Sequence, residues 1–226
     1  MKNQTYKWNS QSLRFVKTFL DVKHPWKNNI LFKNILNSYI FNNKIKNILD
    51  VGCGNAHFLN NICLKKSVKK MGIETSSSAI NLLRQNYSKI KFKKAYCHNL
   101  PFKDESYDFV YAFMVLHCID RNNYLQSLGE LLRVTKKFLM IVDFDPPKPY
   151  FRKNKHNKNF HVYKDDYDQI LSRSGFLKKI VENKFYINAK NEICKINKRI
   201  ASSDERVHHM RKLTIYKKTL TLKKIK

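Results

Sequence analysis

The chain has 226 residues and a formal net charge of +28 at pH 7, because 45 Lys and Arg residues outnumber 17 Asp and Glu residues. This length suits one domain with a sizeable core, and the absence of any run of 18 or more apolar residues argues against a transmembrane helix. The five cysteines are widely spaced and form no C-x-x-C pair, so they predict neither a disulfide framework nor a zinc site and favour a cytoplasmic location with free thiols.

Residues 1–44 carry apolar side chains at helix-like spacing, which predicts two helices. The first 20 residues are polar and lack the continuous apolar segment of a signal peptide. We therefore expect an N-terminal helical cap over residues 1–44 and one larger domain over residues 45–226. Trp8 and Trp26 are candidates to line a cleft beneath this cap, although core packing is the commoner use of such residues.

A strand, a tight turn and a helix are predicted between residues 48 and 64. The apolar strand ends at Asp50, and Gly52 and Gly54 follow at once; glycine permits positive φ and a close approach of the backbone to a ligand. A dinucleotide-binding G-x-G-x-x-G motif would need a third glycine where His57 stands, and the G-K-[ST] of a phosphate-binding P-loop is absent. The acid beside the turn would repel a pyrophosphate but would favour a cationic ligand.

A second short strand, residues 71–75, ends in Glu74 and Thr75. Glu74 lies 20 residues after Gly54, which is the spacing at which doubly wound folds place an acid on a ribose. Further strands are predicted near residues 90–92 and over 104–112, and the helix that ends in Arg133 and Val134 leads into another strand at residues 138–144.

Four segments together resemble class I S-adenosylmethionine (SAM) dependent methyltransferases of the type 11 group. They are the D-V-G-C-G-N-A turn, the L-P-F and S-Y-D-F-V segments, the V-L-H-C-I-D segment that starts at Val115, and the helix end at Arg133–Val134, and they cover roughly residues 45–145. The resemblance implies an α/β, Rossmann-like sheet of seven mostly parallel strands, doubly wound, with an antiparallel last strand. It also implies SAM as cofactor and S-adenosylhomocysteine as product.

The same resemblance implies which residues hold the cofactor. Two departures from the family pattern are Ala56, which replaces the third glycine, and Tyr96, which replaces the Asp that binds adenine. We therefore expect residues 97–99 to contact adenine in place of this Asp. The predicted cofactor-binding residues are Asp50, Gly52, Cys53, Gly54, Glu74, Thr75, Cys97, His98, Asn99, Leu100 and Phe113.

The last third of the chain completes the expected sheet. A rigid and then basic loop is predicted over residues 146–159, a helix over 163–171, and a final antiparallel pair of strands over 176–187 and 206–216. Short pieces of this region resemble small methyltransferases of bacterial surface-polysaccharide and nucleotide-sugar synthesis. That resemblance implies transfer of a methyl group to an O or N atom of a sugar, a nucleotide-sugar or another small polar acceptor.

Two other functions stay open at this stage. A basic surface is typical of nucleic-acid binding, so a tRNA methyltransferase is the main alternative, although the 36 Lys and 9 Arg argue against recognition that depends on arginine forks. A partner subunit without catalysis is less favoured, because the cofactor motif is intact. The oligomeric state is not indicated.

Acid–base catalysis adds about 10²–10⁴-fold if the acceptor is a hydroxyl. His117 and Asp145 are the predicted catalytic residues, and His156 and His161 are further candidates. No metal site is predicted: the loop histidines lack a fixed carboxylate partner, and the adjacent His208 and His209 would point to opposite faces of a strand.

Overall fold

A computed structural model describes residues 38, 43–62, 67–153, 161–187, 193–195 and 210–220. Almost all of the predicted N-terminal cap, with Trp8 and Trp26, lies outside these residues, as do His156, His208 and His209. The division at residue 45 therefore stays a prediction, and the first described strand begins at Asn47.

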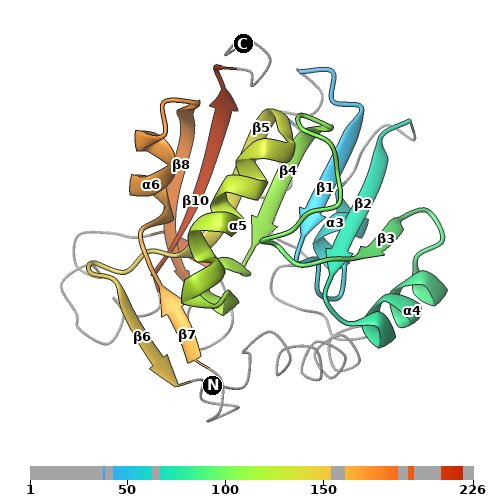
Figure 1. Ribbon diagram of the computed structural model, residues 1–226, viewed down its shortest axis with the longest axis horizontal. Coiled ribbons are helices and arrows are strands. Elements are labelled where there is room, and N and C mark those ends of the chain that lie inside the picture. Colours follow the sequence, from blue (N-terminus) through green and yellow to red (C-terminus); the bar gives the residue numbers. More distant parts are fainter. Residues whose placement is uncertain are drawn as a thin grey trace.

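The molecule is built around one twisted sheet with the strand order β3-β2-β1-β4-β5-β10-β8-β9 (Figure 1). Strands β1 to β5 pair in parallel, whereas β10 is antiparallel to both β5 and β8. The strands are β1 (Asn47–Val51), β2 (Lys69–Glu74), β3 (Lys91–Lys94), β4 (Tyr107–Phe113), β5 (Thr135–Phe144), β8 (Leu177–Ile187), β9 (Ile193–Lys195) and β10 (Met210–Lys218). The predicted seven strands with an antiparallel last strand are confirmed, and β9 adds a three-residue edge.

Helices cover both faces of the sheet. They are α3 (His57–Asn61), α4 (Ser77–Asn86), the 3₁₀ helix η2 (Leu116–Cys118), α5 (Arg121–Val134) and α6 (Tyr167–Arg173). Figure 1 shows α5 and α6 in front of the sheet and α3 behind it. This is the doubly wound arrangement, in which the parallel strands are buried on both faces.

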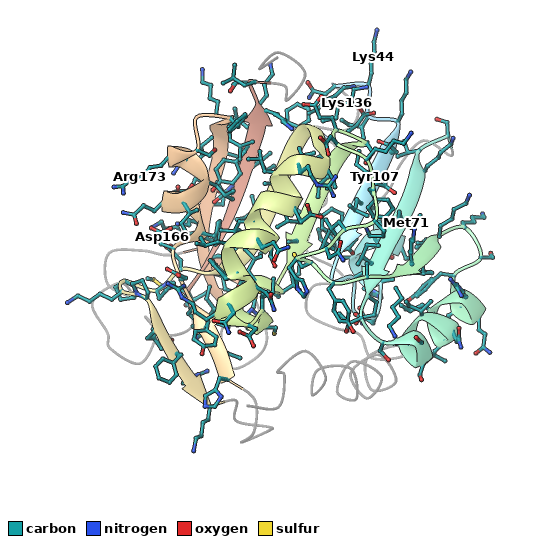
Figure 2. The ribbon with its side chains drawn as sticks, viewed as in Figure 1. Lys44, Met71, Tyr107, Lys136, Asp166 and Arg173 are labelled. Carbon is teal, nitrogen blue, oxygen red and sulfur yellow. The ribbon has the colours of Figure 1, made fainter. Side chains whose placement is uncertain are left out.

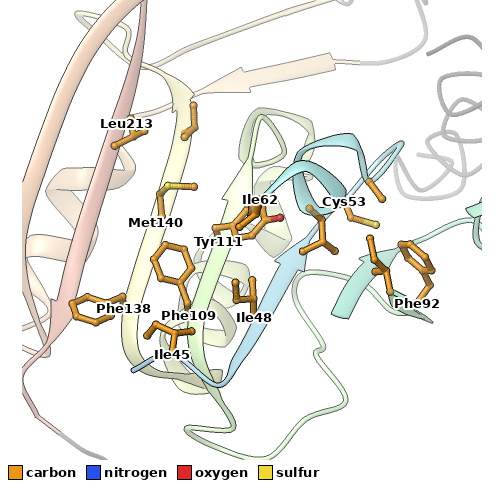
Figure 3. Packing of buried hydrophobic residues seen from close by; sticks show 14 of the residues in the cluster. Ile45, Ile48, Cys53, Ile62, Phe92, Phe109, Tyr111, Phe138, Met140 and Leu213 are labelled. Carbon is orange, nitrogen blue, oxygen red and sulfur yellow. The ribbon is translucent and has the colours of Figure 1, made fainter. Parts of the chain in front are cut away.

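Alternate residues of each strand feed two separate cores. Ile48, Phe109 and Met140 face the α3 and α4 side, where they pack with Tyr111, Phe138 and Leu213 (Figure 3). Their neighbours Leu49, Val110 and Leu139 face α5 and α6. Because both faces of these strands are buried, their segments read as continuous apolar runs rather than as alternating patterns.

Two elements differ from the sequence-based expectation. The predicted loop over residues 146–159 contains β6 (Tyr150–Lys153), which pairs antiparallel with β7 (His161–Lys164) as a separate ribbon. The predicted helix over 163–171 begins only at Tyr167, because the Asp166 side chain accepts hydrogen bonds from the backbone N–H groups of residues 168 and 169 and so caps the helix there.

The ribbon lies beyond one end of the sheet, next to the carboxyl ends of β4 and β5, and β7 contacts η2 (Figure 1). At the opposite end of the molecule, Lys44 and Lys136 point outward (Figure 2). Positive charge is therefore not confined to the end that carries the ribbon. No helix in the described ranges is long and apolar enough to cross a membrane.

Candidate functional site

The turn after β1 takes the backbone conformation that its glycines predict. Gly52 and Gly54 have φ of +77° and +52°, and the N–H groups of Gly52 and Cys53 both donate to the carbonyl of Ile73 at 2.9 Å. A Cβ atom on Gly52 would lie 2.4 Å from Cγ2 of Val115. Glycine is therefore required at position 52 by its φ and by the close packing of the segment that follows β4.

A pocket of about 570 Å³, counting its open mouth, lies at the carboxyl ends of β1, β2 and β4. In a doubly wound sheet this edge is where ligands bind. Five of the predicted cofactor residues line it, namely Gly52, Glu74, Thr75, Cys97 and His98. The sequence reasoning missed several further lining residues: Val51, Ile73, Ala95, Tyr96, Val115, Cys118, Ile119, Asp120 and Asn123.

Six of the predicted cofactor residues are absent from the pocket lining. Leu100 and Cys53 are buried in the two cores, and burial raises the pKa of the Cys53 thiol well above its usual range. Phe113 packs against Phe58 with ring centroids 4.8 Å apart. Gly54, Asn99 and Asp50 also lie outside the lining.

Glu74 stands at the end of β2 and is almost fully buried, with 3% of its surface exposed. Its Oε1 accepts hydrogen bonds from the Thr75 backbone N–H at 2.6 Å and from the Thr75 hydroxyl at 3.0 Å. These contacts fix the carboxylate at the pocket wall. A fixed carboxylate at this position suits a ligand that offers hydroxyl donors, such as a ribose.

Asp50 is buried behind the turn. The Tyr111 hydroxyl donates to its Oδ2 at 2.9 Å, whereas its Oδ1 is buried and accepts no hydrogen bond from a described residue. Burial raises the pKa of Asp50 to about 8, the Tyr111 hydrogen bond opposes this rise, and the charge of Glu74 adds to it. A buried acceptor without a donor favours a cationic partner in the pocket region, because a positive charge would stabilise the carboxylate.

The part of the pocket wall that follows β3 is built by the turn that contains Tyr96, where the family pattern has Asp. The Tyr96 and His98 rings stack with their centroids 5.5 Å apart and an interplanar angle of 11°. Glu130 and Arg133 of α5 brace this turn: the Leu100 N–H donates to Glu130 at 2.7 Å, and Arg133 donates to the Leu100 carbonyl at 2.9 Å. The pocket therefore meets aromatic faces here rather than a carboxylate.

His117 is held in η2 by Asp143 of β5. Asp143 Oδ1 lies 2.9 Å from His117 Nδ1, and Oδ2 accepts from the Leu116 N–H at 2.8 Å and from the His117 N–H at 3.3 Å. Burial lowers the pKa of His117, but the charges of Cys118 and Asp143 outweigh burial and raise it to about 10. The imidazole is therefore protonated near neutral pH, a state that donates but does not accept a proton.

Asp145 follows β5 and is neutralised by two lysines. Its carboxylate lies 3.0 Å from Lys212 Nζ and 2.8 Å from Lys184 Nζ. Within the described residues, no three His, Cys, Asp or Glu side chains gather in a way that could hold a metal ion.

Most of the parallel part of the sheet matches a known protein family. Residues 48–137 match the family described as a methyltransferase domain. Over this range the chain is similar to class I SAM-dependent methyltransferases.

Individual relatives agree with this similarity. An O-methyltransferase of Aspergillus nomiae is 30% identical over 149 residues, which are 60% of this chain and 65% of that protein. The chain spans only about half to two thirds of the length of such curated relatives, with 54% and 52% for O-methyltransferases of Pyrenophora dematioidea and Penicillium expansum.

Solved methyltransferase structures share the fold of this chain. A SAM-dependent methyltransferase of Methanosarcina mazei superposes with a TM-score of 0.63 at 16% identity, over 82% of this chain and 97% of that one. The 1,6-didemethyltoxoflavin-N1-methyltransferase of Burkholderia thailandensis, solved with its acceptor and S-adenosylhomocysteine, gives 0.61 at 12% identity, over 97% and 92%.

Proposed function

We propose that the protein transfers a methyl group from SAM to a hydroxyl oxygen of a small polar acceptor, such as a sugar or nucleotide-sugar. The observation that carries this proposal is the pocket at the carboxyl edge of the sheet, whose wall includes both Gly52 of the glycine turn and Glu74 of β2. Oxygen is favoured over nitrogen as the methylated atom because three curated relatives bear the name O-methyltransferase.

The residues present fit SAM. The buried Oδ1 of Asp50 lacks a donor among the described residues, and the α-ammonium of SAM is a cation of the kind it favours. Glu74 would receive the ribose hydroxyls, and the Tyr96 and His98 rings would supply a stacking wall for adenine. When bound, SAM supplies a methyl group that its sulfonium has already activated.

The chain itself must then position the acceptor and exclude water. Cys118 and Ile119 line the pocket on the side that follows β4, and His117 precedes Cys118 in η2. Asp143 fixes this segment by three hydrogen bonds. The hydrogen bonds of His117 with Asp143 favour a positioning role over that of general base, and the two lysine contacts of Asp145 favour the same.

Methyl transfer from radiolabelled SAM into a fractionated lysate of the source organism tests this function. We expect counts in the small-molecule or glycan pool. Counts that ribonuclease removes would instead support the RNA alternative, which the net charge of +28 motivates. A Glu74→Gln variant, expected to bind S-adenosylhomocysteine at least tenfold more weakly, serves as the control for cofactor-dependent labelling. The cytoplasmic location remains a prediction from the free cysteines.

A further inference from the structure

The part of the pocket wall that α5 supplies carries an asparagine amide with no partner among the described residues. Asn123 lies in the first turn of α5 and lines the pocket. Its backbone N–H donates to the Asp120 carbonyl at 2.9 Å, and its backbone carbonyl accepts from the Ser127 hydroxyl at 2.7 Å. No described residue hydrogen-bonds to its side-chain amide. A donor and an acceptor therefore stand side by side at the pocket wall, available to a ligand.

One face of α5 runs along the turn that follows β3. Side chains three or four residues apart share a face of a helix, so Asn123, Ser127 and Glu130 form a row. At one end of the row, Glu130 accepts from the Leu100 N–H at 2.7 Å. In its middle, the Cys97 thiol hydrogen-bonds with the Ser127 side chain. The row thus follows the turn backwards from Leu100 to Cys97, and it reaches Asn123 where the turn enters the pocket.

Cys97 holds the turn and the start of α5 together. Burial raises the pKa of its thiol to about 12, although the Ser127 hydrogen bond opposes this rise, so the thiol keeps its proton at pH 7. The single hydroxyl proton of Ser127 goes to the Asn123 carbonyl, and the thiol is therefore the donor to Ser127. This chain of hydrogen bonds fixes Asn123 in one position relative to the turn.

The turn itself lacks a paired donor and acceptor at the pocket. Where the family pattern has the Asp that binds adenine, this chain has Tyr96, whose ring stacks on His98 with centroids 5.5 Å apart. Each of these rings offers a flat wall to a base, with single polar atoms at its edge. Asn99, which carries an amide and was expected to contact adenine, lies outside the lining. The polar edge of an adenine therefore needs a partner from another element.

The remaining carboxylates of the pocket do not match that edge. Glu74 hydrogen-bonds with Thr75 at the end of β2, the position assigned to the ribose. Asp120 accepts from the Asn122 N–H at 3.0 Å and so caps α5, and a carboxylate donates no hydrogen bond. Adenine presents an amino donor beside a ring-nitrogen acceptor. Of these side chains, only the amide of Asn123 offers the complementary pair.

We propose that Asn123 recognises the adenine of SAM and takes the place of the Asp that Tyr96 replaces. Its amide oxygen accepts from the 6-amino group, and its amide N–H donates to the adjacent ring nitrogen, a pairing that asparagine makes with adenine elsewhere. The inference rests on the proposed function, since it assigns this pocket to SAM. It adds that the base is recognised from α5 rather than from the turn after β3.

The test compares two ligands by calorimetry: S-adenosylhomocysteine and its analogue in which unsubstituted purine replaces adenine, so that only the 6-amino group is missing. The unaltered protein should bind the analogue about tenfold more weakly, which is the scale of one hydrogen bond. Asn123→Ala should bind S-adenosylhomocysteine about tenfold more weakly than the unaltered protein does. It should bind the two ligands within about twofold of each other, because the amino group has lost its acceptor.

Asn122→Ala is the matched control. Asn122 is the neighbouring residue in the same turn, is exposed and does not line the pocket. The backbone N–H that Asp120 accepts from remains in this variant, which should bind both ligands as the unaltered protein does. Alanine favours a helix more than asparagine does, so thermal unfolding without ligand should show that both variants are folded.

The outcomes separate this inference from the proposed function. If the unaltered protein does not bind S-adenosylhomocysteine, the cofactor assignment fails and the inference fails with it. If the unaltered protein binds it and Asn123→Ala binds it equally well, Asn123 does not recognise the base and the cofactor assignment stands. If Asn123→Ala still distinguishes the two ligands as strongly as the unaltered protein, or if Asn122→Ala loses as much affinity, the amide does not meet the 6-amino group and the inference is overturned.

Discussion

Removal of the Asp143 carboxylate should cost the protein about 4 kcal/mol of unfolding free energy. The carboxylate accepts hydrogen bonds from three backbone N–H groups and lies 2.9 Å from His117 Nδ1, and only 3% of the residue is exposed. Removing one partner of a buried charge pair costs roughly 3–5 kcal/mol, because the other group keeps its desolvation penalty. Asp143→Ala leaves the His117 imidazole and the backbone N–H groups of η2 without this acceptor.

Urea denaturation of Asp143→Ala measures this loss directly. Domains of this kind have about 5–15 kcal/mol of stability, so the variant should still fold. Asp143→Asn keeps one acceptor oxygen and should lose about half as much. It also removes the charge that holds the His117 pKa high, so the pKa should fall toward its usual range in an NMR titration.

Asp104→Ala is the matched control. Asp104 also pairs with a cation, Arg133, at 2.8 Å, but its side chain is 56% exposed, and exposed pairs contribute less than about 1 kcal/mol. If Asp143→Ala were no more destabilising than Asp104→Ala, the carboxylate would not hold η2, and the reasoning about His117 would be refuted.

Further predictions concern the cofactor pocket. Glu74→Ala should weaken S-adenosylhomocysteine binding at least tenfold in calorimetry, and an unchanged affinity would contradict the ribose assignment. The Asp50 pKa is raised to about 8, and a bound cation lowers it, so SAM binding at pH 7 should release up to about one proton. Calorimetry in buffers of different ionisation enthalpy measures this release, and Asp50→Asn should abolish it. Gly52→Ala should destabilise the fold by several kcal/mol through its clash with Val115, and a double variant with Val115→Ala should recover only part of this, since the positive φ at residue 52 remains.

Most of the central sheet could be predicted from the sequence because its signals are local. Apolar runs that end in Asp50 or Glu74 fix the ends of β1 and β2, and the glycines between them fix the turn. These signals and the family resemblance together located five of the fourteen residues that line the pocket. The wall formed by Cys118, Ile119 and Asn123 was missed, because a resemblance in that segment gives its place in the chain and not the direction of each side chain.

The ribbon could not be found in this way. β6 pairs with β7 across residues 154–160, and each strand has only four residues. So short an element gives no clear period, and three prolines shortly before Tyr150 favour a loop. Lys164 of this ribbon and Arg211 of β10 both lie over the ring of Phe144. These elements are distant in sequence, so no local pattern could have indicated the contact.

The place of β10 in the sheet has a consequence for how the protein is made. β10 lies between β5 and β8, although it is the last described strand to be synthesised. Until residues 210–218 have left the ribosome, β5 has an open edge and β8 has no strand to join it to the rest of the sheet. Open edges invite pairing with other chains, and domains begin to fold from the N-terminus during synthesis. During synthesis the nascent chain therefore passes through a stage in which β5 is present and β10 is not. The unpaired edge of β5 exposes the chain to aggregation at that stage.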